Sequence, residues 1–149
     1  RLEHLDLKHR LLLVPRPKGG EKRAFEIPLS REMIRCAIRA IRLGRALYPE
    51  HAGTWLFAAD SKAGHLVETK EDRSELSKWG NDLRQTYRTI AQIAGVNEVD
   101  IHLLMNHSVL NVNTGYITRH KLVLDHLRRQ QQAISAAMRV PTLPASMLE

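Results

Sequence analysis

The sequence predicts an α+β domain that is mostly α-helical, with a small antiparallel β-element near its start. Two segments that are rich in strand-forming residues, 11–15 and 23–29, flank a Gly-Gly turn. Apolar residues at helical spacing then run through most of the chain. The 149 residues are 43% hydrophobic and 26% charged, which fits one folded domain and argues against a disordered chain.

A hairpin followed by a helix is expected in the first third of the chain. Leu-Leu-Leu-Val-Pro at 11–15 is predicted to be a buried strand, and Arg-Pro-Lys-Gly-Gly at 16–20 is a turn signal. Ser30 is expected to cap a helix that stops at Pro49. One side of this helix is basic, through Arg35, Arg39, Arg42 and Arg45. Trp-Leu-Phe at 55–57 is predicted to form a short strand.

Four helices are expected in the rest of the chain, over residues 74–78, 81–94, 98–105 and 119–138. Gly95 closes the second of them and Asn97 caps the third. The last helix carries an apolar stripe of Leu124, Leu127, Ile134 and Met138. This stripe is expected to pack on its own domain or, alternatively, on a neighbouring protomer. We expect one domain over residues 1–140 and a loose tail over 141–149.

Charge and composition narrow the function classes. The chain has 23 Lys and Arg against 16 Asp and Glu, a net charge of +7, which points to a polyanion such as nucleic acid or to a basic surface without a partner. No apolar run approaches the roughly 20 residues that span a bilayer, so no membrane protein is expected. Cys36 is the one cysteine, which excludes an internal disulfide and fits a reducing, cytoplasmic environment. The histidines lack metal-ligand spacing, so no metal is expected.

Four segments carry the residue types that phosphoryl transfer needs. They are Pro-Lys-Gly-Gly at 17–20, Asn-Asp-Leu-Arg-Gln-Thr-Tyr at 81–87, Leu-Leu-Met-Asn-His-Ser at 103–108, and Asn-Thr-Gly-Tyr-Ile-Thr at 113–118. A phosphodiester repels nucleophiles, so cationic donors must neutralise it. The Arg84 guanidinium can bind two phosphate oxygens at once. A free phenol such as that of Tyr116 has a pKa near 10, so its ionisation at pH 7 costs about 4 kcal/mol.

This set of segments resembles the catalytic domain of tyrosine recombinases, the phage-integrase family. The family has a lysine on a β-hairpin, followed by a "VPLS"-like strand end; here these are Lys18 and Ile-Pro-Leu-Ser at 27–30. Residues 81–87 resemble its H-x-L-R-[RHQ]-[TS]-[FY] motif, and 103–108 resemble L-L-G-H-S. Tyr116 stands nine residues after His107, as the family's nucleophile does. Residues 2–6 resemble its L-x-W-x-D-I-D stretch, so the resemblance covers roughly 1–120.

The resemblance implies the tyrosine-recombinase fold and a role for each matching residue. Tyr116 would attack phosphorus, and Arg84 and His107 would bind the phosphate. Lys18 would protonate the leaving oxygen. Asn81 stands where the family has a histidine, and asparagine cannot exchange a proton near neutral pH.

The implied partners are double-stranded DNA and other integrase protomers in a synaptic tetramer, with exchange of the C-terminal helix. The implied reaction needs neither metal nor ATP, so no cofactor is expected. The family's first arginine would fall before Arg1, so the fragment is expected to be inactive alone.

Each of these residues also has an ordinary structural interpretation. Lys18 alone would be a solvated turn residue, Arg84 a partner in a surface ion pair, His107 a capping or core histidine, and Tyr116 a packing residue. Tyr87 is expected in the core.

Two other function classes stay open. One is a DNA-binding or regulatory remnant of an integrase without turnover. The other is an unrelated basic helix-turn-helix module built from residues 83–105.

Overall fold

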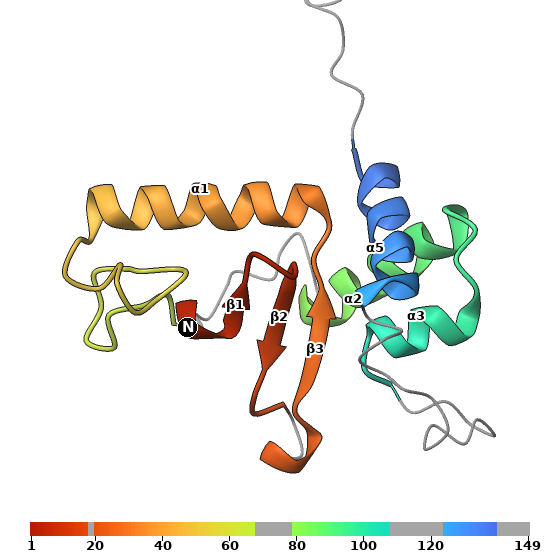
Figure 1. Cartoon of the computed structure of the whole chain (residues 1–149), viewed down its shortest axis with the longest axis horizontal. Coiled ribbons are helices and arrows are strands. Elements are labelled where there is room, and N and C mark those ends of the chain that lie inside the picture. Colours follow the sequence, from red (N-terminus) through yellow and green to blue (C-terminus); the bar gives the residue numbers. More distant parts are fainter. Residues whose placement is uncertain (18–19, 68–78, 108–123, 140–149) are drawn as a thin grey trace, which may run out of the picture.

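The computed structural model describes residues 1–17, 20–67, 79–107 and 124–139. In these ranges the chain is α+β, with a three-stranded antiparallel sheet and four α-helices (Figure 1). The strands are β1 (Leu5–Asp6), β2 (Leu11–Val14) and β3 (Phe25–Pro28). The helices are α1 (Arg31–Leu47), α2 (Trp79–Ile93), α3 (Glu98–Leu104) and α5 (His126–Ala137). None of the helices in the described ranges is both long enough and apolar enough to cross a bilayer.

The predicted hairpin is confirmed, but its first strand is only partly buried and not fully buried as predicted: Leu11 is 5% exposed and Leu13 is 39% exposed. β2 pairs with β3 antiparallel, in a register that places Leu12 opposite Ile27 and Val14 opposite Phe25. The second strand is shorter than predicted because Glu21–Arg23 forms a turn of 3₁₀ helix before it. β1 lies on the other side of β2 and was not predicted, since a two-residue strand is too short to show an alternating pattern.

The helix predicted after Ser30 is confirmed as α1. The Ser30 hydroxyl accepts a hydrogen bond from the Met33 backbone N–H at 3.1 Å, which satisfies one of the free donors of the first turn. α1 ends at Leu47, two residues before Pro49. Ser30 itself is fully buried at the junction between β3 and α1, so the cap fixes the angle at which α1 leaves the sheet.

The strand predicted at 55–57 is wrong. This segment forms turns, and the pairing nearby is a single bridge between Ala58 and His65. The Trp55 ring packs against the His65 ring with centroids 4.0 Å apart, so the aromatic residue fills a loop instead of a sheet face. Gly64 is required in this loop: its φ is +73°, and a Cβ would lie 2.8 Å from the His51 ring.

The two central helices and the turn between them are confirmed. Gly95 has a φ of +75° and ends α2, as expected for a glycine after the last helical turn. The Asn97 side chain then accepts a hydrogen bond from the Asp100 N–H at 2.9 Å and caps α3. The predicted helix at 74–78 and the predicted tail at 141–149 both lie outside the described residues.

The single long helix predicted over 119–138 is corrected. Residues 119–123 lie outside the described ranges, and Asp125 is a turn residue that precedes α5. The Asp125 φ of −114° departs from helical geometry, so α5 begins anew at His126.

α5 supplies the centre of the core. Leu127 and Ile134 are almost completely buried and lie in one cluster with side chains of β2, α2 and α3. Figure 1 shows α5 between α1 on one side and the α2–α3 pair on the other. The apolar stripe of this helix therefore packs on its own domain, except for Met138, which is 41% exposed.

Candidate active site

The structure describes two of the five predicted site side chains. Arg84 lies in the first half of α2 and is exposed. His107 is exposed and follows α3 by three residues. Asn81 lies in the first turn of α2, and its side chain is outside the described part, as are Lys18 and Tyr116 entirely. The roles of these three residues therefore stay predictions.

Arg84 lies on α2, and His107 follows α3, which packs against α2. After the turn at Gly95, α3 runs back along α2 (Figure 1). The first half of α2 and the end of α3 therefore lie at the same end of the pair. Arg84 makes no hydrogen bond or ion pair within the described ranges, so its guanidinium is available for a ligand. A free arginine and an exposed histidine are both suitable donors to a phosphate oxygen.

The position of His107 is set by the way α3 ends. Asn106 has a φ of +55°, in the left-handed region that asparagine tolerates better than most residues. The chain turns there, and the His107 N–H donates a hydrogen bond to the His102 carbonyl oxygen at 2.8 Å. The His107 ring meets the His102 ring edge-on, with centroids 5.7 Å apart. The hydrogen bond holds the His107 backbone against α3, and the ring contact orients its exposed side chain.

A row of charged and polar side chains leads from α2 to His107. Arg88 pairs with Glu98, and the same Glu98 carboxylate lies 3.0 Å from His102 Nε2. His102 Nδ1 is buried and has no partner within the described ranges. If the proton of the His102 ring sits on Nε2, that nitrogen donates to the Glu98 carboxylate, and Nδ1 is left as an acceptor. Glu98 therefore orients the ring against which His107 rests.

A second polar contact below α3 joins it to α5. Asp100 is 4% exposed, and its Oδ2 lies 2.6 Å from His126 Nε2 and 2.7 Å from Asn97 Nδ2. One carboxylate thus holds both the cap of α3 and the first residue of α5. Neither helix can shift without leaving a buried charge short of partners.

Sequence reasoning missed both polar groups. Glu98 and His102 are four apart on a helix, so their contact could have been proposed from spacing. The contact of Asp100 with His126 joins residues 26 positions apart and had no local signal.

The prediction that Tyr87 belongs to the core is confirmed. It packs against the central hydrophobic cluster, and burial raises the pKa of Tyr87 to about 12. A phenol that ionises so reluctantly is unsuited to act as a nucleophile at neutral pH. Among the described residues, no group of three or more His, Cys, Asp or Glu side chains is arranged to hold a metal ion.

Comparison with protein-family models, with curated proteins and with solved structures finds no match for this chain.

Proposed function

We propose that this chain is part of the catalytic domain of a tyrosine-type DNA recombinase, which cleaves and rejoins DNA through a 3′-phosphotyrosine. One observation carries the proposal: four motifs occur in family order, and Tyr116 stands nine residues after His107. Each motif alone has an ordinary structural explanation. Four coincidences of order and spacing would be needed to explain them all in that way.

Two structural features support the proposal without testing it. The segment that carries Lys18 connects β2 and β3, and the strand that follows ends in a capped helix, as in the motif order of the family. The residue before His107 adopts a left-handed backbone conformation at Asn106, where the family motif has glycine. Asn106 thus adopts a backbone conformation that glycine also adopts readily.

The proposed reaction balances without a cofactor. Arg84 and His107 would neutralise the nonbridging phosphate oxygens, and the Tyr116 hydroxyl would lose its proton to solvent as its oxygen attacks phosphorus. The bond from phosphorus to the 5′ oxygen breaks, and Lys18 gives a proton to that oxygen, so a 5′-hydroxyl leaves. The bond energy stays in the phosphotyrosine, and attack by a second 5′-hydroxyl rejoins the strand.

A DNA-binding module without turnover is the second candidate function, and Asn81 favours it. The family has a histidine there, and an asparagine can donate a hydrogen bond but cannot take up or release a proton near neutral pH. The helix-turn-helix alternative is less well supported. α3 has seven residues, of which Asp100, Ile101, Leu103 and Leu104 are buried, so little of it is left to enter a groove.

A covalent-adduct assay decides between the two candidates. The full-length protein that contains these residues is incubated with a nicked duplex, whose short cleaved strand diffuses away and traps the intermediate. The recombinase proposal expects a protein–DNA adduct that survives denaturation, is lost in Tyr116→Phe, and remains in Tyr48→Phe. Adduct formation by Tyr116→Phe would overturn the assignment of the nucleophile. Duplex binding without any adduct would favour the non-cleaving module.

A further inference from the structure

α1 carries a row of arginines along one side. Successive arginines on this helix are three or four residues apart, which places them within one arc of the helix surface. All five are exposed, and together we call them the arginine face: Arg31, Arg35, Arg39, Arg42 and Arg45. The row is about 21 Å long at the rise of an α-helix.

No acidic side chain of the described ranges neutralises this face. The one acidic residue of α1 is Glu32, and it is already bound by Gln132 of α5 and by Arg139, which follows α5. Arginines that are three or four residues apart on a helix repel each other by a few tenths of a kcal/mol per pair. The helix therefore carries a charge arrangement that lowers its own stability, which indicates that an external anion is its counterpart.

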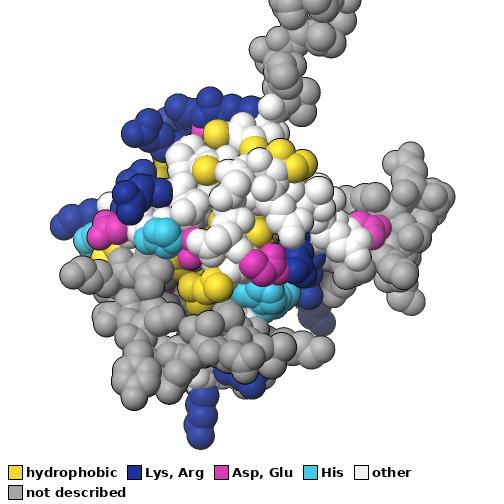
Figure 2. All heavy atoms as spheres, turned by 90° about the vertical axis from the view of Figure 1, so that its right-hand side faces the viewer, with side chains coloured by type: hydrophobic (Ala, Val, Ile, Leu, Met, Phe, Trp, Pro, Cys, Tyr) yellow, Lys and Arg dark blue, Asp and Glu magenta, His cyan; other side chains and the backbone are white. Residues whose placement is uncertain are grey.

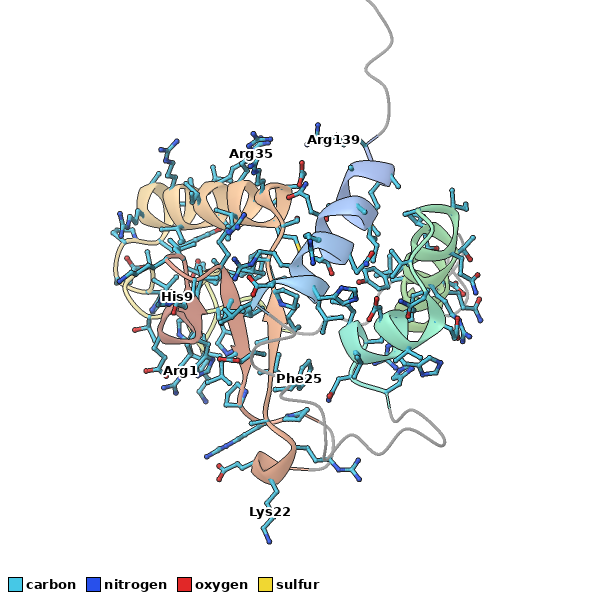
Figure 3. All side chains as sticks on the ribbon, turned by 45° about the vertical axis from the view of Figure 1, so that its right-hand side comes forward. Arg1, His9, Lys22, Phe25, Arg35 and Arg139 are labelled. Atoms are coloured by element: carbon cyan, nitrogen blue, oxygen red, sulfur yellow. The ribbon has the colours of Figure 1, made fainter. Side chains whose placement is uncertain are left out.

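The arginine face points away from the protein. The opposite side of α1 contains the buried Ala37 and Gly44, which fixes the rotation of the helix about its axis. Figure 3 shows Arg35 pointing outward from α1, near the end of α5 where Arg139 lies. In Figure 2 the largest group of Lys and Arg side chains lies along the upper left edge of the molecule, at the level of α1 in Figure 1, and smaller groups lie at the right and at the bottom.

The chemistry of the face fits the backbone of a nucleic-acid duplex. All five cations are arginines, whose planar guanidinium binds phosphate through two parallel hydrogen bonds. A duplex offers one negative charge about every 1.7 Å along its axis, dense enough to meet every member of the row. α1 has no aromatic residue to stack unpaired bases and no Asn or Gln to read adenine. The lack of an aromatic residue favours a duplex over a single strand.

We propose that the arginine face of α1 is a second nucleic-acid-binding surface, which holds the phosphate backbone of a duplex separately from the candidate active site. α5 lies between α1 and the α2–α3 pair that carries Arg84 and His107 (Figure 1). The surface would therefore hold phosphates other than the one at the candidate active site, and it would do so whether or not the chain cleaves DNA.

The test compares two triple variants of the 149-residue chain that lose the same charge. The face variant is Arg35→Gln, Arg39→Gln and Arg42→Gln. The control is Lys8→Gln, Lys62→Gln and Arg129→Gln, all exposed and all outside α1. Binding to a labelled duplex of arbitrary sequence is measured between low and moderate salt, with circular dichroism to confirm that both variants fold.

The proposal expects the face variant to bind about tenfold more weakly or worse, with a salt slope less steep by about 2 to 3 because three phosphate contacts are lost. The control should change both quantities much less. Equal losses in the two variants would show that only net charge matters and would overturn the proposal. Binding to labelled polyglutamate is measured in the same way. A face variant that binds the duplex normally but no longer binds polyglutamate would also overturn the proposal, because the partner would then be an acidic polypeptide. Neither result depends on the adduct assay, so this surface and the proposed strand cleavage fail or succeed separately.

Discussion

The Tyr87 hydroxyl donates a hydrogen bond to Gln131 Oε1 at 2.9 Å and joins α2 to α5 across 44 positions of sequence. Gln131 is 5% exposed, and its amide nitrogen reaches the Ser135 hydroxyl at 3.4 Å. This small polar chain lies beside the central cluster. These hydrogen bonds give Tyr87, three residues after Arg84, a structural role. The tyrosine of the proposed chemistry is a different one, Tyr116.

Tyr87→Phe should lower the free energy of unfolding by about 1–3 kcal/mol, because it leaves the buried Gln131 acceptor unpaired. The pKa of Tyr87 is raised to about 12 in the folded chain against 10 in the unfolded chain. The unfolded state therefore releases its proton first, and stability is lost as pH rises from 10 towards 12. Tyr87→Phe should remove that alkaline component of a denaturant titration, and Tyr48→Phe should retain it. Equal alkaline loss in wild type and Tyr87→Phe would contradict the buried-phenol explanation.

Glu32 should make the protein sensitive to acid at the junction of α1 and α5. Its hydrogen bond from Arg139, with a further one from Gln132, lowers the pKa of Glu32 from 4.5 to about 2. The stabilisation is therefore complete above pH 4.5 and is lost as pH falls towards 2. Glu32→Gln should lower Tm at pH 7, and its deficit relative to wild type should shrink below pH 4. A deficit that stays constant down to pH 2 would show that ionisation of Glu32 is not involved.

Asp100→Ala should destabilise the fold by about 1–3 kcal/mol. The change removes the buried carboxylate that accepts from the exposed Asn97 amide and from the half-exposed His126 ring. Asp60→Ala removes the same group from an exposed loop and should change stability by less than about 0.5 kcal/mol. Urea unfolding of both variants measures the difference, and similar values would mean that the carboxylate does not link α3 to α5.

Arg84→Lys should reduce the rate of adduct formation by about 100-fold or more, since a lysine cannot bind two phosphate oxygens in parallel. Folding should be unaffected, because Arg84 is exposed and unpaired within the described ranges. Arg88→Lys lies one turn along the same helix and keeps its charge beside Glu98, so it serves as the control. If both variants lose the same activity, the effect reports on a general need for arginine side chains on α2 and not on a phosphate ligand at Arg84.

The chain should sediment as a monomer if α5 stays in its own core. Leu127 and Ile134 are already buried there, so no apolar stripe is left for a partner apart from Met138. Exchange of this helix between protomers would instead give a dimer whose amount rises with concentration. Sedimentation at several concentrations separates the two, and a truncation after Arg119 should fail to fold in the first case.

The sequence by itself determined the elements that local chemistry specifies. The Gly-Gly turn and the strand-forming residues on either side of it define the hairpin, the Ser30 hydroxyl caps α1, and Gly95 and Asn97 form the turn between α2 and α3. Each of these signals acts within a few residues, so no knowledge of the fold is required. The same holds for the order of the four motifs, which the sequence displays directly.

Only the tertiary structure decided how distant residues meet. The two-residue strand β1 exists because β2 offers it a partner, and the helix expected from residue 119 is broken at Asp125 before α5. The contacts of Asp100 with His126 and of Tyr87 with Gln131 join segments that no periodicity relates. Such pairings form because burial makes an unpaired polar group expensive, and which groups are buried together depends on the packing of the whole chain.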